Sequence, residues 1–189
     1  MKKFLAILIV SVFAVVVSGS VAMAKDLTGK IGLGFNSQLD CGAISVKYGI
    51  SNDMGVEGFI GYGSYEEDYG AAGSYEESSN VVGGKFFYNV IMEKNANFYI
   101  GGGLAILGGE GTEIDPSGAM YKVKFSGTGL LGYAGTEFFF TDLPNLGFLF
   151  EVGLGIMNGK EKYNGSSVDV SDMSFYGGLF HQIGIHYYF

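Results

Sequence analysis

The sequence predicts an all-β fold: an eight-stranded antiparallel up-and-down transmembrane β-barrel. Three observations lead to this prediction. Apolar residues recur at every second position in eight successive segments. The polar connections between these segments alternate between short and long. The residues between the apolar positions are small and rich in glycine, which accounts for 33 of the 189 residues. Such residues suit the cramped interior of a narrow barrel.

Residues 1–24 have the features of a cleavable secretory signal peptide. Two lysines precede an apolar run at residues 4–17, and Ala22, Met23 and Ala24 form a small-residue cleavage pattern. The alternative is a retained helical anchor, but Ser18, Gly19 and Ser20 interrupt the apolar run. We therefore expect a signal peptide over residues 1–24 and a barrel domain over residues 25–189.

The eight segments each have about the length of a tilted membrane strand, which needs roughly nine to eleven residues. They span residues 27–36, 42–50, 54–65, 80–90, 97–109, 121–140, 147–159 and 173–189. Connections 51–54, 92–97 and 141–146 are short and rich in turn formers, whereas 66–79, 110–120 and 160–172 are longer and polar. The first outer connection, residues 37–42, is short and departs from this pattern. The alternation predicts that both termini lie on the periplasmic side.

The side of the wall that is apolar decides between a membrane barrel and a soluble lipocalin-like barrel. In the second segment, Ile44 and Val46 share one face, while Ser45 and Lys47 share the other. The polar face carries few charges, although a surface in contact with water is normally dense in lysine and glutamate. The polar face is therefore expected to line the lumen, and the apolar face is expected to contact lipid.

The final eight residues, "QIGIHYYF", continue the alternation to the last position. Gln182, Gly184, Tyr187 and Phe189 resemble the C-terminal assembly signal of bacterial outer-membrane barrels. Over residues 25–189 the chain resembles the small outer-membrane barrels of the OmpA and OmpX type. This resemblance implies a monomer in the bacterial outer membrane, recognised by the barrel-assembly machinery and in contact with outer-membrane lipid and lipopolysaccharide.

Six charged residues fall on the predicted lumen face. Three cations and three anions should meet near the periplasmic end, because a buried charge needs a partner. We expect a salt-bridge layer that fills the lower lumen; the alternative is a polar constriction or gate for a small solute. The six residues are Lys30, Lys47, Glu57, Lys85, Glu137 and Glu151.

Two "SYEE" repeats flank the connection between the third and fourth segments. They place five carboxylates together without a lysine, and carboxylate oxygens suit calcium or magnesium. The site would then be a cation-binding loop; the alternative is a solvated hairpin tip. The carboxylates belong to Glu66, Glu67, Asp68, Glu76 and Glu77.

Composition excludes some functions. The chain has a net charge of −8 and no arginine, so it lacks the clustered cations that bind nucleic acid. Cys41 is the single cysteine, and His181 and His186 are the two histidines, neither followed by a serine at a suitable spacing. We expect no catalytic residues, no resident metal and no cofactor. The predicted role is structural or surface interaction with a closed lumen; a narrow channel or carrier is the alternative, and a lipid-modifying barrel enzyme is third.

Overall fold

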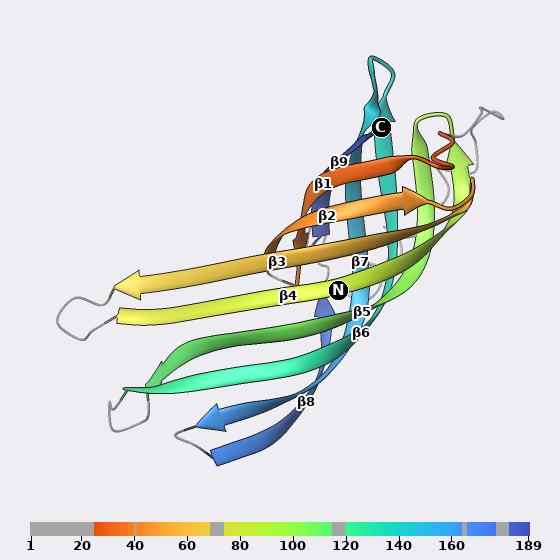
Figure 1. The fold of residues 1–189 in the computed structure, drawn as a ribbon. Helices are drawn as coiled ribbons and strands as arrows, with labels where there is room; N and C mark the ends of the chain where they lie inside the picture. The colour runs from red at the N-terminus through yellow and green to blue at the C-terminus, as the bar shows by residue number, and fades with distance from the viewer. Residues whose placement is uncertain (1–24, 40, 69–73, 115–119, 164–165, 177–181) are drawn as a thin grey trace, which may run out of the picture.

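A computed structural model describes residues 25–39, 41–68, 74–114, 120–163, 166–176 and 182–189. The expected signal peptide and His181 lie outside these residues. Among the described residues, no helix is long and apolar enough to cross a membrane. The chain folds into strands joined as neighbouring hairpins (Figure 1). The strands are β1 (Ile31–Gln38), β2 (Cys41–Gly49), β3 (Met54–Asp68), β4 (Ser74–Glu93), β5 (Ala96–Ile114), β6 (Met120–Phe140), β7 (Leu143–Tyr163), β8 (Ser166–Tyr176) and β9 (Gln182–Tyr188).

The wall closes as a ring of eight strand positions. Each strand from β1 to β7 pairs antiparallel with the next one along the chain. Strands β8 and β9 share the eighth position, because both pair with β7: β8 along residues 153–163 and β9 along residues 146–151. Strand β9 then pairs with β1 and completes the ring. The predicted up-and-down barrel is confirmed.

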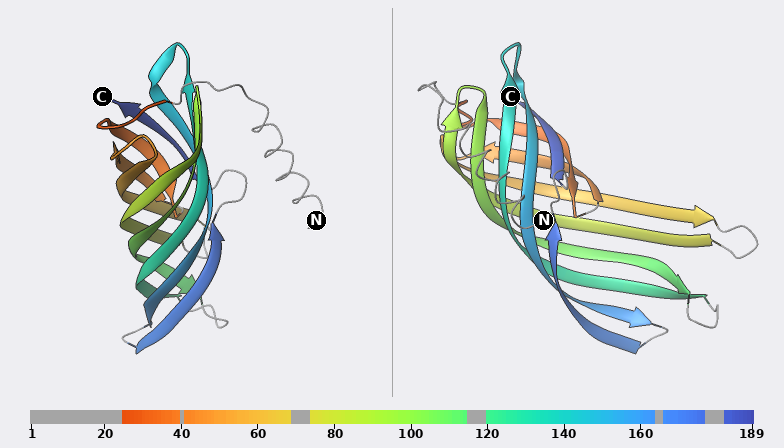
Figure 2. Two further views of the ribbon diagram at one scale, coloured as in Figure 1. Left: turned by 90° about the vertical axis from the view of Figure 1, so that its right-hand side faces the viewer. Right: turned by 180° about the vertical axis from the view of Figure 1, so that it is seen from behind.

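Strand length varies around the wall. Strands β1 and β2 have 8 and 9 residues, whereas β6 and β7 have 21 each. The hairpins β3–β4, β5–β6 and β7–β8 therefore run well past the β1–β2 hairpin at one end, which we call the long-hairpin end (Figure 2). The turns at residues 50–53, 94–95 and 141–142 lie at the other end, the short-turn end, together with Lys25 and Phe189.

The long polar connections are a correction to the sequence-based expectation. Much of 66–79, 110–120 and 160–172 was expected to be loop, yet most of their described residues continue the strand ladders. The pairing of β3 with β4, for example, extends to Asp68 and Ser74. The backbone ladder needs no apolar face, so it continues where the apolar alternation stops.

The outer wall is apolar. Phe35, Ile60 and Leu104 are 66%, 64% and 67% exposed, and residues of the same parity on each strand point the same way. Such a surface does not suit water, and a soluble barrel would have the opposite arrangement. The side chains form an outer belt that includes Leu33, Phe35, Ile44, Val46, Ile60, Leu104, Ile106, Leu130, Leu154 and Ile156.

The lumen is filled by side chains, with glycines making room for the largest of them. A Cβ at Gly101 would lie 2.5 Å from the Tyr133 hydroxyl, and a Cβ at Gly34 would lie 2.6 Å from the His186 ring. Toward the long-hairpin end, a layer of buried apolar residues follows the polar part of the lumen. This layer consists of Leu39, Cys41, Phe59, Val81, Ala105 and Leu131.

Candidate functional site in the barrel lumen

Five of the six predicted lumen charges lie inside the barrel. Each is at most 3% exposed, and together they form what we call the charged layer: Lys47, Glu57, Lys85, Glu137 and Glu151. Lys30 is a correction, because its side chain is exposed at the short-turn end, just before β1. The backbone N–H of Lys30 donates to the Leu27 carbonyl in a tight turn that precedes the wall. Correct parity does not bury a residue that precedes its strand.

Two lysines form ion pairs with three carboxylates. Lys85 Nζ lies 2.7 Å from Glu151 Oε2 and 3.2 Å from Glu57 Oε2. Lys47, the cross-strand neighbour of Glu57, has its Nζ 3.0 Å from Glu137 Oε2. All these distances permit charge-assisted contacts, which is what buried ions require.

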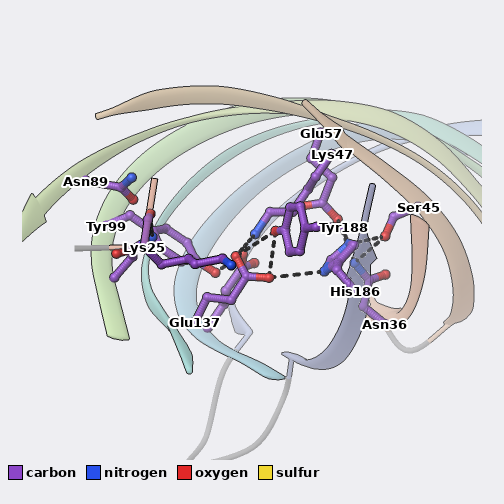
Figure 3. A network of polar contacts seen from close by, with 12 residues as sticks. Lys25, Asn36, Ser45, Lys47, Glu57, Asn89, Tyr99, Glu137, His186 and Tyr188 are labelled. Carbon is purple, nitrogen blue, oxygen red and sulfur yellow. Dashed lines mark hydrogen bonds and ion pairs between the residues drawn. The ribbon is translucent and has the colours of Figure 1, made fainter. Parts of the chain in front are cut away.

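Tyrosine hydroxyls satisfy further carboxylate oxygens. Tyr99 donates to Glu151 Oε1 at 2.8 Å, and Tyr188 donates to Glu137 Oε1 at 2.7 Å. Figure 3 shows Tyr188 and Glu137 pointing toward each other within the network. These two tyrosines were not among the predicted site residues. Their parity was readable from the sequence, whereas their partners across the barrel were not.

Aromatic rings complete the surroundings of the lysines. Lys47 Nζ lies 4.9 Å from the centre of the Phe87 ring and 5.1 Å from that of Tyr99. Lys85 Nζ lies 5.1 Å from the centre of the Tyr133 ring. A cation within about 6 Å of a ring is attracted to it, so each ammonium has both anionic and aromatic neighbours.

His186 joins the charged layer from the last strand. Its Nε2 lies 2.7 Å from Ser45 Oγ, and Glu57 Oε1 and Glu137 Oε1 lie 3.9 Å from Nε2 and 3.6 Å from Nδ1. A carboxylate therefore faces each ring nitrogen. Asn36 Nδ2 donates to Glu57 Oε1 at 2.6 Å and links the histidine side of the layer to β1.

Ser45, His186 and Glu137 have the order of a hydroxyl, an imidazole and a carboxylate in a nucleophilic triad. The contact distances are 2.7 Å from Ser45 to His186 and 3.6 Å from His186 to Glu137. However, the three residues are 1%, 0% and 2% exposed, so the hydroxyl is enclosed. Because Tyr188 and Lys47 already engage Glu137, the arrangement is part of the packed polar network.

Four of the five predicted cation-binding carboxylates lie on paired strands and not in a loop. Glu66 and Glu76 are directly opposite each other on β3 and β4, and Glu67 and Glu77 stand opposite Tyr75 and Tyr65. Successive strand residues point to opposite faces, so these four acids divide between the two faces of the hairpin. Asp68 ends β3. Among the described residues, no three His, Cys, Asp or Glu side chains are placed to hold a metal ion.

The predicted assembly-signal residues alternate across the wall. Gln182 and Gly184 are buried, whereas Tyr187 and Phe189 are 47% and 65% exposed. Gln182 donates through Nε2 to Gln38 Oε1, which ties the polar face of β9 to β1. The Phe189 N–H donates to the Ile31 carbonyl at 2.9 Å. Strand β9 is thus bonded into the seam of the ring.

Comparison with solved structures addresses the fold. The crystal structure of a major outer membrane protein from Thermus thermophilus matches with a TM-score of 0.55 and 13% identity, over 85% of this chain and 98% of that chain. The fold is that of an outer-membrane β-barrel. The N-terminal β-barrel domain of Pseudomonas aeruginosa OprF matches with a TM-score of 0.47 and 17% identity, over 85% and 96% of the two chains. No family model and no curated protein matches the sequence.

This comparison confirms the resemblance to small outer-membrane barrels at the level of the fold. The exposed outer belt is the surface that such a barrel turns toward lipid. The buried polar network lies on the opposite face of the wall, within the lumen.

Proposed function

We propose that the protein is an outer-membrane barrel with a structural and surface role, and that its lumen is closed to solutes. The charged layer carries this proposal. Lys85 and its carboxylates bridge β3, β4 and β7, and Lys47 with Glu137 bridges β2 and β6. The contacts thus cross the lumen instead of lining one wall.

The apolar layer supports the same proposal. The apolar layer lies on the long-hairpin side of the charged layer, and its Phe59, Val81 and Leu131 are at most 4% exposed. Water and ions are disfavoured beside such side chains because they find no polar partners there. Two layers of opposite character therefore occupy successive levels of one narrow lumen.

Single-channel recording on the refolded full-length barrel in a planar bilayer tests this proposal. We expect no discrete current steps from the wild-type protein or from Glu151→Gln. The exposed Lys124→Gln variant is the matched control for the loss of one charge outside the lumen. Ohmic steps from the wild type that change size in Glu151→Gln, and not in Lys124→Gln, would contradict a closed lumen.

A narrow channel is the second candidate, favoured by one observation. Asn36 Oδ1, Gln182 Oε1 and Gln38 Nε2 are buried and have no hydrogen-bond partner within the described part of the chain. Unsatisfied polar atoms of this kind favour hydration or rearrangement of the lumen. The same recording separates the two candidates.

A further inference from the structure

The lysines are unevenly distributed. Of those that follow residue 24, Lys47 and Lys85 are buried, and Lys25, Lys30 and Lys94 lie at the short-turn end. All the others are exposed on two adjacent strands toward the long-hairpin end: Lys122 and Lys124 on β6, and Lys160 and Lys162 on β7.

These four lysines share the outer face of the wall. Each has the same strand parity as Leu130 on β6 or Ile156 on β7, which are 57% and 46% exposed in the outer belt. The lysines therefore point outward, as the belt does, and not into the mouth of the barrel.

Lys124 and Lys162 are direct cross-strand partners. Like charges directly opposite each other destabilise a sheet. Glu110 offsets part of this repulsion, because its Oε2 lies 3.1 Å from Lys124 Nζ. A bound anion would offset the remaining repulsion between Lys124 and Lys162.

The outer face is hollowed at this point. A hollow of about 430 Å³ is lined by Lys124, Lys160 and Lys162, with Glu110 as the carboxylate among its lining residues. Ser78, Asn80 and Ser126 add hydroxyl and amide donors to the same hollow. Several ammonium groups with neutral donors form a surface suited to phosphate oxygens.

The level of the hollow indicates which phosphates it would meet. Leu130 and Ile156 are cross-strand partners near the upper edge of the outer belt. Lys160 follows Ile156 by four positions, which is about 13 Å along a strand and roughly 10 Å along the normal of a membrane that contains tilted strands. This is the level of the headgroups above the hydrocarbon, and the lysine stem can extend toward them.

We propose that this basic hollow binds the phosphorylated headgroup of a lipid in the outer leaflet, of the lipopolysaccharide class. The site opens sideways from the wall directly above the outer belt, where a headgroup is the adjacent anion. The proposal requires the barrel to sit in the outer membrane, but it does not depend on whether the lumen conducts.

The test uses the refolded full-length barrel with bisphosphorylated lipid A and its dephosphorylated form, with binding measured by native mass spectrometry from detergent. Lys124→Gln combined with Lys162→Gln removes the opposed pair. Lys30→Gln combined with Lys94→Gln is the matched control, because it removes two exposed lysines at the other end. A third arm adds millimolar inorganic phosphate as a competitor.

We expect the wild type to prefer the phosphorylated lipid by about tenfold, which corresponds to about 1.4 kcal/mol. The preference should disappear in the Lys124/Lys162 double variant and persist in the Lys30/Lys94 control and in the presence of phosphate. Equal binding of both lipid forms by the wild type would overturn the proposal. So would an undiminished preference in the Lys124/Lys162 variant, an equal loss in the control, or displacement by inorganic phosphate.

Discussion

The molecule contains two lysine–glutamate ion pairs, one buried in the lumen and one exposed on the outer face. Lys85 and Glu151 lie 2.7 Å apart with side chains 0% and 1% exposed, whereas Lys124 and Glu110 lie 3.1 Å apart with side chains 66% and 52% exposed. The distances differ little, so burial is the main difference. The exposed ions keep their hydration and are screened by salt. The buried ions depend on each other and on their protein neighbours.

The comparison shows where a charge determines structure. In a closed lumen no water replaces a lost partner, so we expect the loss to extend to Glu57, Tyr99 and the lysine's ring contacts. On the outer face, water replaces the lost partner. We therefore expect the lumen pair to contribute far more to the stability of the barrel than the surface pair does.

The largest expected effect comes from breaking the buried pair. Glu151→Ala should lower the free energy of unfolding by about 3 to 5 kcal/mol, because Lys85 then keeps a single carboxylate and Tyr99 loses its acceptor. The measurement is urea unfolding of the barrel in lipid vesicles, followed by circular dichroism. An unchanged midpoint would show that water enters the charged layer.

We expect a smaller loss of stability when the hydroxyl of Tyr99 is removed and its aromatic ring is kept. Tyr99→Phe deletes the hydroxyl that donates to Glu151 Oε1, and we expect a loss of about 1.5 to 3 kcal/mol, typical of a hydrogen bond to a charged group. Tyr62→Phe is the control, since Tyr62 is 62% exposed on the outer wall. If the two variants unfold alike, the Tyr99 hydroxyl contributes nothing specific.

The smallest effect is expected at the exposed pair. The Lys124 ammonium lowers the pKa of the Glu110 carboxyl by hydrogen bonding and by its charge, and Lys122 adds to this shift. A lowered carboxyl pKa stabilises the folded state above the usual carboxyl range, and the stabilisation is lost as pH falls through the lowered pKa. Solvent screening removes most of this contribution.

Glu110→Ala should therefore leave the unfolding midpoint unchanged at neutral pH, and the wild type and the variant should respond alike to acid. The same vesicle assay measures both. A destabilisation comparable with that of Glu151→Ala would mean that burial does not distinguish the two pairs.

The sequence predicted which face of the wall each residue occupies better than it predicted which residues that side chain contacts. Alternation placed Lys47, Glu57, Lys85, Glu137 and Glu151 on the lumen face because side chains alternate along any strand. It could not pair Lys47 with Glu137, which are 90 positions apart, because contacts across a lumen depend on how far the strands are staggered around the ring.

The sequence also did not predict where the strands begin and end. Lys30 has the lumen parity, but the chain turns at Gly29, where φ is 71°, and the wall begins at Ile31. At the opposite end, the ladders continue through residues that are polar on both faces, such as Glu66 and Glu67 of β3. Apolar alternation marks the part of a strand that faces lipid, whereas hydrogen bonding decides where the strand ends.

The most direct test of a closed lumen is the reactivity of a thiol placed in the charged layer. With Cys41→Ser as the background, Ser45→Cys places a thiol at a position 1% exposed, and Ser126→Cys places one on the exposed outer face above the belt. A small charged methanethiosulfonate should label Ser126→Cys rapidly and leave Ser45→Cys unmodified until the barrel is unfolded. Labelling of folded Ser45→Cys at a rate close to that of Ser126→Cys would contradict the closed lumen.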